Sequence, residues 1–150
     1  MKKTYILLGL LIASATCFSQ DWVEVYEDDD LRGNIHISSM KISGDVVYVW
    51  FEEIYHGYAF RENFINHAIE LDTPISASKI RLWNNFYYTM EYMAFDCSKR
   101  ALRSMETIYY TKSGQTIIHQ RDEKILGGFR RVVPDSRGEF LLNFVCSYKQ

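Results

Sequence analysis

The first half of the chain alternates apolar and polar residues with the period of β-strands. Residues 35–42 follow this pattern, but their apolar phase switches between Ile37 and Met40, which predicts a β-bulge. A turn at residues 43–45 leads into a continuous apolar run at 46–51 that is rich in β-branched and aromatic residues. The two segments therefore predict a β-hairpin.

The clearest strand pattern lies in the middle of the chain. Over residues 80–95, apolar side chains occupy alternate positions on one face, and Asn84 is the only break. This pattern predicts one long strand, bent or bulged. The connection before it, residues 56–77, is irregular, and only residues 66–71 favour a turn of helix. Further short strands are predicted at 22–26, 102–110, 116–120 and 129–133, with a tight turn at 112–114.

The C-terminal segment changes to the period of a helix. Ser136 and Glu139 form a capping box, in which each side chain binds a backbone N–H that has no partner at the helix start. The apolar residues that follow are spaced i, i+3, i+4, i+7, as one helix face requires: Leu141, Phe144, Val145 and Tyr148. The complete pattern predicts an α+β fold, a mainly antiparallel sheet of about six strands with the C-terminal helix packed on it.

The N-terminus has the features of a secretory signal peptide. Lys2 and Lys3 precede an apolar stretch at residues 5–13, and small residues lead to Ser19, where cleavage would leave residues 20–150 as one domain. The apolar stretch is too short for a transmembrane span, and no later segment is a candidate. We therefore expect an exported protein, in the periplasm, on the outer-membrane surface or secreted. Whether Cys17 is lipidated stays open.

Removal of the signal peptide leaves two cysteines, Cys97 and Cys146. An even number in an oxidising compartment favours a disulfide bond. This bond would join the C-terminal helix to the end of the long strand. The alternative is two separate buried thiols.

The charge balance argues against two classes of partner. The chain has 17 basic and 19 acidic residues, and loss of Lys2 and Lys3 leaves 15 and 19, a mature net charge of about −4. Nucleic-acid-binding proteins usually present a clustered basic face. Attachment to an anionic membrane surface also requires basic residues. We expect neither kind of partner.

No group of residues predicts catalysis. The four histidines lack metal-ligand spacing, and the run at residues 28–30 fails as a calcium loop because Arg32 occupies its fifth position. Glu52 and Glu53 would point to opposite faces of a strand, so they cannot act together as an acid–base pair. We therefore expect no catalytic residues, no metal, no cofactor and no enzymatic activity.

Aromatic residues make up 15% of the chain, and they gather at residues 50–60 and 83–95. One interpretation is that they fill a thin core between sheet and helix. The other is that part of them forms an exposed protein-binding patch, because Tyr and Trp bury a large area at low entropic cost. The candidates for such a patch are Tyr55, Tyr58, Trp83 and Tyr87.

Several short sequence blocks follow one another along the chain in an order that can be compared with known families. Two are centred on the cysteines: D-C-x-x-R at residues 96–100, and P-D-S-x-x-E at residues 134–139 with Val145-Cys146 behind it. Trp22, residues 37–39, residues 44–50 and Tyr109-Tyr110 complete the series. This order resembles the bacterial surface-adhesin protein E family over nearly the whole mature chain.

The resemblance implies an antiparallel sheet flanked by helix, bridged cysteines and a surface or periplasmic location in a Gram-negative bacterium. For the member that gave the family its name, it implies adhesion to extracellular-matrix proteins and dimer formation. We therefore expect an exported, non-enzymatic module that binds an extracellular-matrix or envelope protein and can form a homodimer. The alternative is a small-ligand-binding or structural periplasmic protein. Residues 56–77 match no part of the family pattern, so no binding residues are transferred there.

Overall fold

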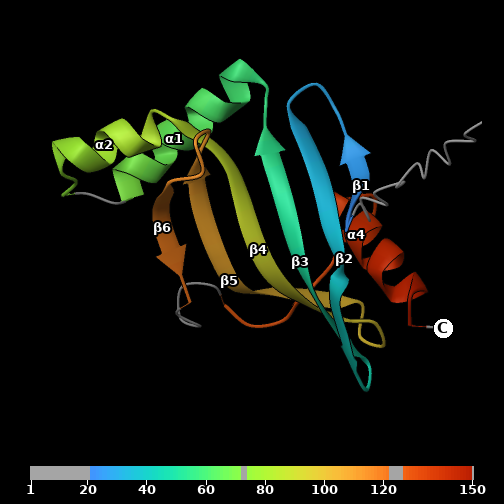
Figure 1. Cartoon of the computed structure of the whole chain (residues 1–150). Helices are drawn as coiled ribbons and strands as arrows, with labels where there is room; N and C mark the ends of the chain where they lie inside the picture. The colour runs from blue at the N-terminus through green and yellow to red at the C-terminus, as the bar shows by residue number, and fades with distance from the viewer. Residues whose placement is uncertain (1–20, 72–73, 122–126, 150) are drawn as a thin grey trace, which may run out of the picture.

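The computed structural model describes residues 21–71, 74–121 and 127–149. In these residues the chain forms a seven-stranded antiparallel sheet, which confirms the α+β fold and adds one strand to the predicted six. Six strands lie side by side in the order of the sequence (Figure 1), and the short β7 pairs with the start of β5. They are β1 (Trp22–Glu27), β2 (Leu31–Ser43), β3 (Val46–Tyr55), β4 (Phe86–Asp96), β5 (Ala101–Thr111), β6 (Thr116–Gln120) and β7 (Arg130–Arg131).

Helices α1 (Tyr58–Leu71), α2 (Ala77–Trp83) and α4 (Arg137–Ser147) pack on the sheet in two groups. Figure 1 shows α1 and α2 beside the β5 and β6 end of the sheet and α4 beside β1 and β2. The buried apolar residues form two clusters, one completed by α4 and the other by α1 and α2. Alternate residues of β3 contribute to both. Val47, Val49 and Phe51 belong to the first cluster, and Tyr55 belongs to the second. Residues at alternate positions share a face. All three helices therefore cover the same face of the sheet.

The prediction of one strand over residues 80–95 is wrong in its first part. Helix α2 extends to Trp83, and β4 begins only at Phe86. The hydroxyl of Ser76 caps this helix by accepting a hydrogen bond from the Lys79 N–H. Ile80 and Trp83 are three residues apart, a spacing that places them on one face of a helix. Burial of Trp83, which is 1% exposed, decides for the helix.

A bulge at Tyr87 also changes which face of β4 enters the core. The register between β4 and β5 shifts between Phe86 and Tyr88, so these two side chains point to opposite faces. Past the bulge, the face that packs against the helices carries Met93 and Phe95. The strongly apolar series at Tyr88, Met90 and Tyr92 lies on the other face.

The irregular connection contains far more helix than the predicted turn at residues 66–71. Helix α1 has 14 residues, but Ile65 is the only fully buried one. Its inner face also contains Phe64, Ala68 and Ile69, which are partly buried. A helix that buries so few side chains leaves only a weak periodic pattern in the sequence.

The predicted hairpin of β2 and β3 is confirmed in detail. Its register shifts between His36 and Lys41, where the bulge was expected. The Ser39 hydroxyl donates to the His36 carbonyl (2.7 Å) and accepts from the Trp50 N–H (3.0 Å), so a side chain replaces the interrupted ladder bond. Gly44 in the connecting turn has φ +58°, which glycine adopts at little cost.

Helix α4 begins at the predicted cap and is covalently attached to the sheet. The Ser136 hydroxyl accepts from the Glu139 N–H (3.3 Å), whereas the Glu139 carboxylate accepts from the N–H of Asp135, one residue before the expected partner (2.9 Å). The predicted disulfide is present between Cys97, at the end of β4, and Cys146 in α4. Leu141, Leu142 and Val145 of the helix are buried against the sheet.

A carboxylate lies between the two hydrophobic clusters. Glu53 shares the core face of β3 with Phe51 and Tyr55, and its two oxygens accept hydrogen bonds from the hydroxyls of Tyr26 (2.5 Å) and Tyr55 (2.7 Å). The Tyr26 ring lies against Gly33, where an added Cβ would be 2.6 Å from Tyr26 Cε1. Burial and the Glu53 carboxylate both raise the pKa of the two tyrosines, so they remain hydroxyl donors.

A second carboxyl group, Glu91, lies on the same face of the neighbouring strand. Its register partners are Phe51 on β3 and Thr107 on β5, and it accepts a hydrogen bond from the Ser104 hydroxyl (3.2 Å). Burial raises the pKa of Glu91 to about 7, and the Glu53 carboxylate adds to the shift. Arg130 and the Ser104 bond oppose it. The protonated form is therefore favoured in the folded protein.

We expect Cys97→Ser to lower the free energy of unfolding by about 4 kcal/mol in the chain-entropy model, because the bond closes a loop between residues 49 positions apart. Urea unfolding of oxidised protein, reduced protein and the variant measures the effect. Identical midpoints with and without reductant would contradict it.

We expect Glu91→Gln to change how stability depends on pH. Because the pKa of Glu91 is raised from 4.5 to about 7, its contribution to the free energy of unfolding is fully present below the pKa of the unfolded state. This contribution is lost as pH rises through the pKa of the folded state. Urea unfolding at about pH 5 and pH 8 measures the effect. The free energy of unfolding should fall between these two pH values by up to about 3 kcal/mol more in the wild type than in the variant. Glu70→Gln, at an exposed position of α1, is the matched control. Parallel declines in the wild type and Glu91→Gln would contradict the shift.

Candidate protein-binding surface

The face of the sheet opposite the helices is rich in aromatic side chains. Register pairs place Trp50 beside His36 on β2 and Tyr92 on β4, and they place Tyr88 beside Tyr110 on β5. Cross-strand partners share a face, and these alternate with the buried core residues. Among the described residues, no helix covers this face. We call it the open face.

The rings of the open face contact one another across the strands. The ring centroids are 4.7 Å apart for Trp22 and His36, 5.3 Å for Trp50 and Tyr92, and 4.8 Å for Tyr88 and Tyr110, which stack nearly parallel. Each of these side chains is partly buried, because its neighbours cover its edges while its outer surface faces solvent. Met90 and Ile108 pair between the rings. The result is a layer of rings that contact one another across the strands.

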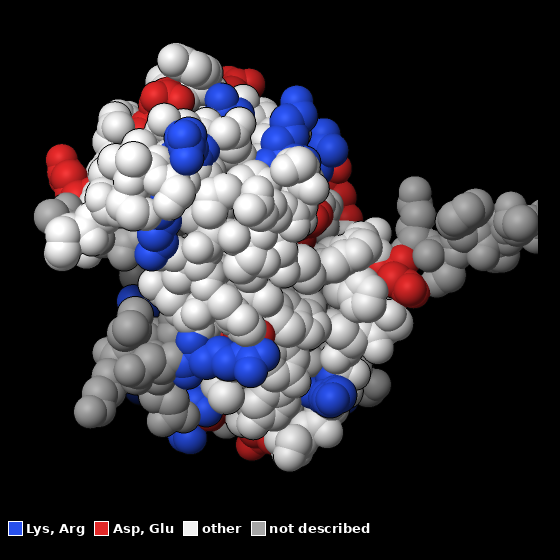
Figure 2. Space-filling model, turned by 60° about the vertical axis from the view of Figure 1, so that its left-hand side comes forward, with Lys and Arg blue, Asp and Glu red and all other residues white. Residues whose placement is uncertain are grey.

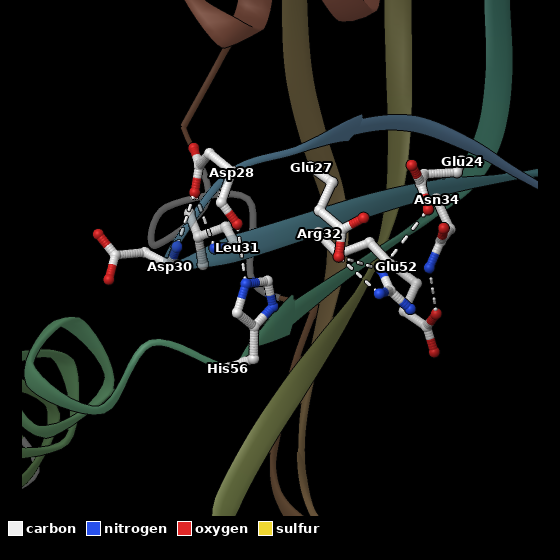
Figure 3. Close-up of polar contacts among 9 residues, drawn as sticks. All are labelled: Glu24, Glu27, Asp28, Asp30, Leu31, Arg32, Asn34, Glu52 and His56. Atoms are coloured by element: carbon white, nitrogen blue, oxygen red, sulfur yellow. Dashed lines mark hydrogen bonds and ion pairs between the residues drawn. The ribbon is translucent and has the colours of Figure 1, made fainter.

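Polar residues border this layer near β1. Figure 3 shows Arg32 between Glu24 and Glu27, with its guanidinium 2.6 Å from the Glu27 carboxylate. Beside it, the Asn34 amide donates to Glu52 (2.9 Å). Register pairing places these residues on the open face together with the rings. The charges are thus largely paired with each other.

A second polar group borders the layer near β6. One oxygen of Glu106 binds His119 Nε2 (2.5 Å) and the Arg121 guanidinium (3.1 Å). Partial burial acts against ionisation, but the bonds from His119 and Arg121 hold the pKa of Glu106 below its usual value. An apolar centre with a paired polar border is the usual composition of a protein–protein interface. Figure 2 shows one side of the molecule, where Lys and Arg side chains lie within a largely uncharged surface and Asp and Glu side chains lie mainly at its margins.

The structure separates the four aromatic residues that the sequence suggested for binding. Tyr55 and Trp83 are 6% and 1% exposed and belong to the cluster of α1 and α2, so they are core residues. Tyr58 on α1 is 72% exposed. Tyr87 is the bulge residue of β4, and the Lys112 ammonium lies 5.5 Å from its ring centroid. A binding role for any of them stays a prediction.

Sequence reasoning missed the rings that do form the open face, above all Trp50, Tyr92 and Tyr110. Trp50 alternates with Val49 and Phe51, and Tyr92 alternates with Glu91 and Met93, so the two faces of each strand were separable in the sequence. No pattern in the sequence showed which face the helices would cover.

A small cavity beside α1 is lined mainly by apolar residues. It measures about 210 Å³, and its lining includes Phe64, His67, Trp83 and Tyr109. Ligand pockets usually measure about 300–1,000 Å³. The cavity therefore gives weaker support for a small-molecule site than the open face gives for a protein partner.

The acidic residues weighed as catalytic or calcium-binding candidates include three that are engaged in structural contacts, Asp28, Glu52 and Glu53. Glu52 points to the open face and Glu53 to the core, which confirms that they cannot act together. The Asp28 carboxylate accepts hydrogen bonds from the N–H groups of Asp30 and Leu31 (2.9 Å each), and the His56 ring binds the Asp28 carbonyl (Figure 3). The same carboxylate forms an ion pair with Arg137. Within residues 21–71, 74–121 and 127–149, no three potential ligands are placed to bind a metal ion.

Comparison with known proteins identifies the family. The sequence model of the surface-adhesin protein E family matches residues 22–147, nearly the whole of the described chain. The chain belongs to the surface-adhesin protein E family. The resemblance noted in the sequence is thereby confirmed. A search of curated proteins found no match.

Two crystal structures of a family protein are similar to this chain. Haemophilus influenzae protein E is 12% identical, with 85% of each chain covered and a TM-score of 0.47. Its second crystal form is also 12% identical, with 85% of this chain and 88% of that chain covered and a TM-score of 0.49. In this member of the surface-adhesin protein E family, none of the described helices is long and apolar enough to cross a membrane.

We expect truncation on the open face to cost much less stability than truncation in the core. Tyr92→Ala removes ring contacts that face solvent and should cost about 1 kcal/mol or less. Phe95→Ala, three positions further on β4, opens a cavity at a fully buried site and should cost about 3–5 kcal/mol. Urea unfolding measures both. Equal losses would mean that another layer covers the open face.

Proposed function

We propose that this chain is an exported, non-enzymatic surface module whose open face binds a protein partner. The observation that supports this most directly is the layer of contacting rings on a sheet face that none of the described helices covers. Partly exposed Trp and Tyr bury a large area on association, and rings that already contact each other lose little freedom. The family to which the chain belongs is one of surface adhesins.

The proposed partner is an extracellular-matrix or envelope protein. An apolar layer bounded by paired charges suits a folded protein surface, because the centre can be dehydrated while the border stays hydrated. Export is part of the proposal and rests on the signal-peptide pattern, in which cleavage after Ser19 leaves a domain of residues 20–150. Residues 1–19 and Cys17 lie outside the described residues. A homodimer that forms through the open face would compete with binding of the protein partner.

We expect Trp50→Ala combined with Tyr92→Ala to weaken partner binding at least about tenfold, because central aromatic residues dominate interface energies. Surface plasmon resonance of oxidised protein against a panel of purified extracellular-matrix proteins, followed by solubilised envelope protein, measures this loss. Sedimentation velocity at the same concentrations detects self-association through the face.

Two variants away from the open face serve as matched controls. Tyr58→Ala on α1 and Phe140→Ala on α4 remove exposed rings of similar size, 72% and 54% exposed, from the helical side. Both should bind like the wild type. If they lose as much affinity as the open-face variant, or if folded wild type binds nothing in either panel, the proposal fails.

A further inference from the structure

The turn between β4 and β5 forms, together with β7, an open groove of about 680 Å³. Three of its lining residues are cations, Lys99, Arg100 and Arg131, and none of the described lining residues is acidic. The remainder are Ser98, Ala101, Phe129 and Val132. The groove is therefore positively charged, whereas the mature chain as a whole has a net charge of about −4.

The groove is built on a rigid base. The buried Asp96 carboxylate accepts from the Lys99 N–H (3.0 Å) and the Ser98 hydroxyl (2.9 Å), which fixes the turn. These bonds, with the backbone N–H first, hold the pKa of Asp96 at about 2. Cys97, the next residue, is bonded to Cys146 in α4. On the other side, the Val132 N–H donates to the Arg100 carbonyl (3.1 Å).

The three cations are held to different degrees. Arg100 is positioned by Glu139 and by the Asn143 amide oxygen (3.2 Å) of α4. The Lys99 ammonium pairs with Asp96 (3.0 Å), but its side chain is 78% exposed, and such an exposed pair stabilises little. Arg131 is exposed and forms no ion pair with a described residue. Lys99 and Arg131 are therefore available to an anion.

An exposed aromatic ring lies in the same groove. Phe129 is 42% exposed, and the Arg103 guanidinium lies 5.1 Å from its ring centroid. Arginine side chains bind oxyanions through two parallel hydrogen bonds, and a ring offers a flat apolar surface for the C–H face of a sugar. Cations and a ring side by side suit a sugar chain with charged substituents.

We propose that this groove binds a sulfated polysaccharide. The sulfate groups contact Lys99 and Arg131, and a sugar ring packs on Phe129. A flat anionic membrane fits the surface less well, because its headgroups would also meet the acidic remainder of the protein. A single flexible chain can follow the groove and avoid those acids. The site lies at the β4–β5 turn and is independent of protein binding through the open face.

Calorimetric titration of the oxidised protein with a size-defined heparin oligosaccharide tests the proposal. We expect Lys99→Gln combined with Arg131→Gln to weaken binding about tenfold and to lower the dependence of log Kd on log salt by about two between about 50 and 200 mM. Arg81→Gln, which removes one exposed cation at the end of α2, is the control outside the groove and should change Kd less than about twofold. Trp50→Ala should bind heparin like the wild type.

Several outcomes would overturn the proposal. One is an equal loss of affinity for Arg81→Gln and for the groove variant, which would indicate general charge attraction. Another is equal binding of desulfated heparin or of polyglutamate, which would exclude sulfate recognition. Binding to vesicles of phosphatidylcholine with phosphatidylglycerol that is tighter than heparin binding and lost in the groove variant would assign the groove to a membrane. Unchanged thermal unfolding of each variant shows that the fold is intact.

Discussion

Burial of a single face of the sheet is the constraint on which the rest of this structure depends. Both hydrophobic clusters lie on that face, and each is completed by a different set of helices. Helix α4 has only 11 residues, and a short helix contributes little stability by itself. The bond between Cys97 and Cys146 holds it in place. A thin core of this kind gains from covalent closure more than a thick core would.

Polar groups lie where the two hydrophobic clusters meet, and they form hydrogen bonds with one another. Glu53 accepts hydrogen bonds from both tyrosine hydroxyls, so this partly buried carboxylate has two strong donors. Among the described residues, one hydroxyl donates to Glu91, and burial raises the pKa of this carboxyl group to about 7. The two carboxyl groups therefore differ in their hydrogen-bond donors although they lie on neighbouring strands. Tyr26 contributes to both clusters and so joins β1 to the rest of the core.

Because the helices take one face, the rings of the other face remain at the surface. They contact one another and leave an apolar area bordered by paired charges. The basic groove at the β4–β5 turn has the opposite character, since it is concave, charged and anchored at the disulfide. The two features offer two chemically different surfaces on one small domain, which is consistent with its membership of a surface-adhesin family.

The sequence determined the features that depend on neighbouring residues or on cysteine pairing. The bulge near Ser39, the turn at Gly44, the cap at Ser136 and the disulfide each follow from local chemistry or from residue type. Tertiary packing decided the rest. Residues 80–83 are too few for their periodicity to distinguish a helix from a strand, and burial of Trp83 selects the helix. Tyr55 and Trp50 lie on opposite faces of β3, and the side on which the helices pack makes one a core residue and the other a surface residue.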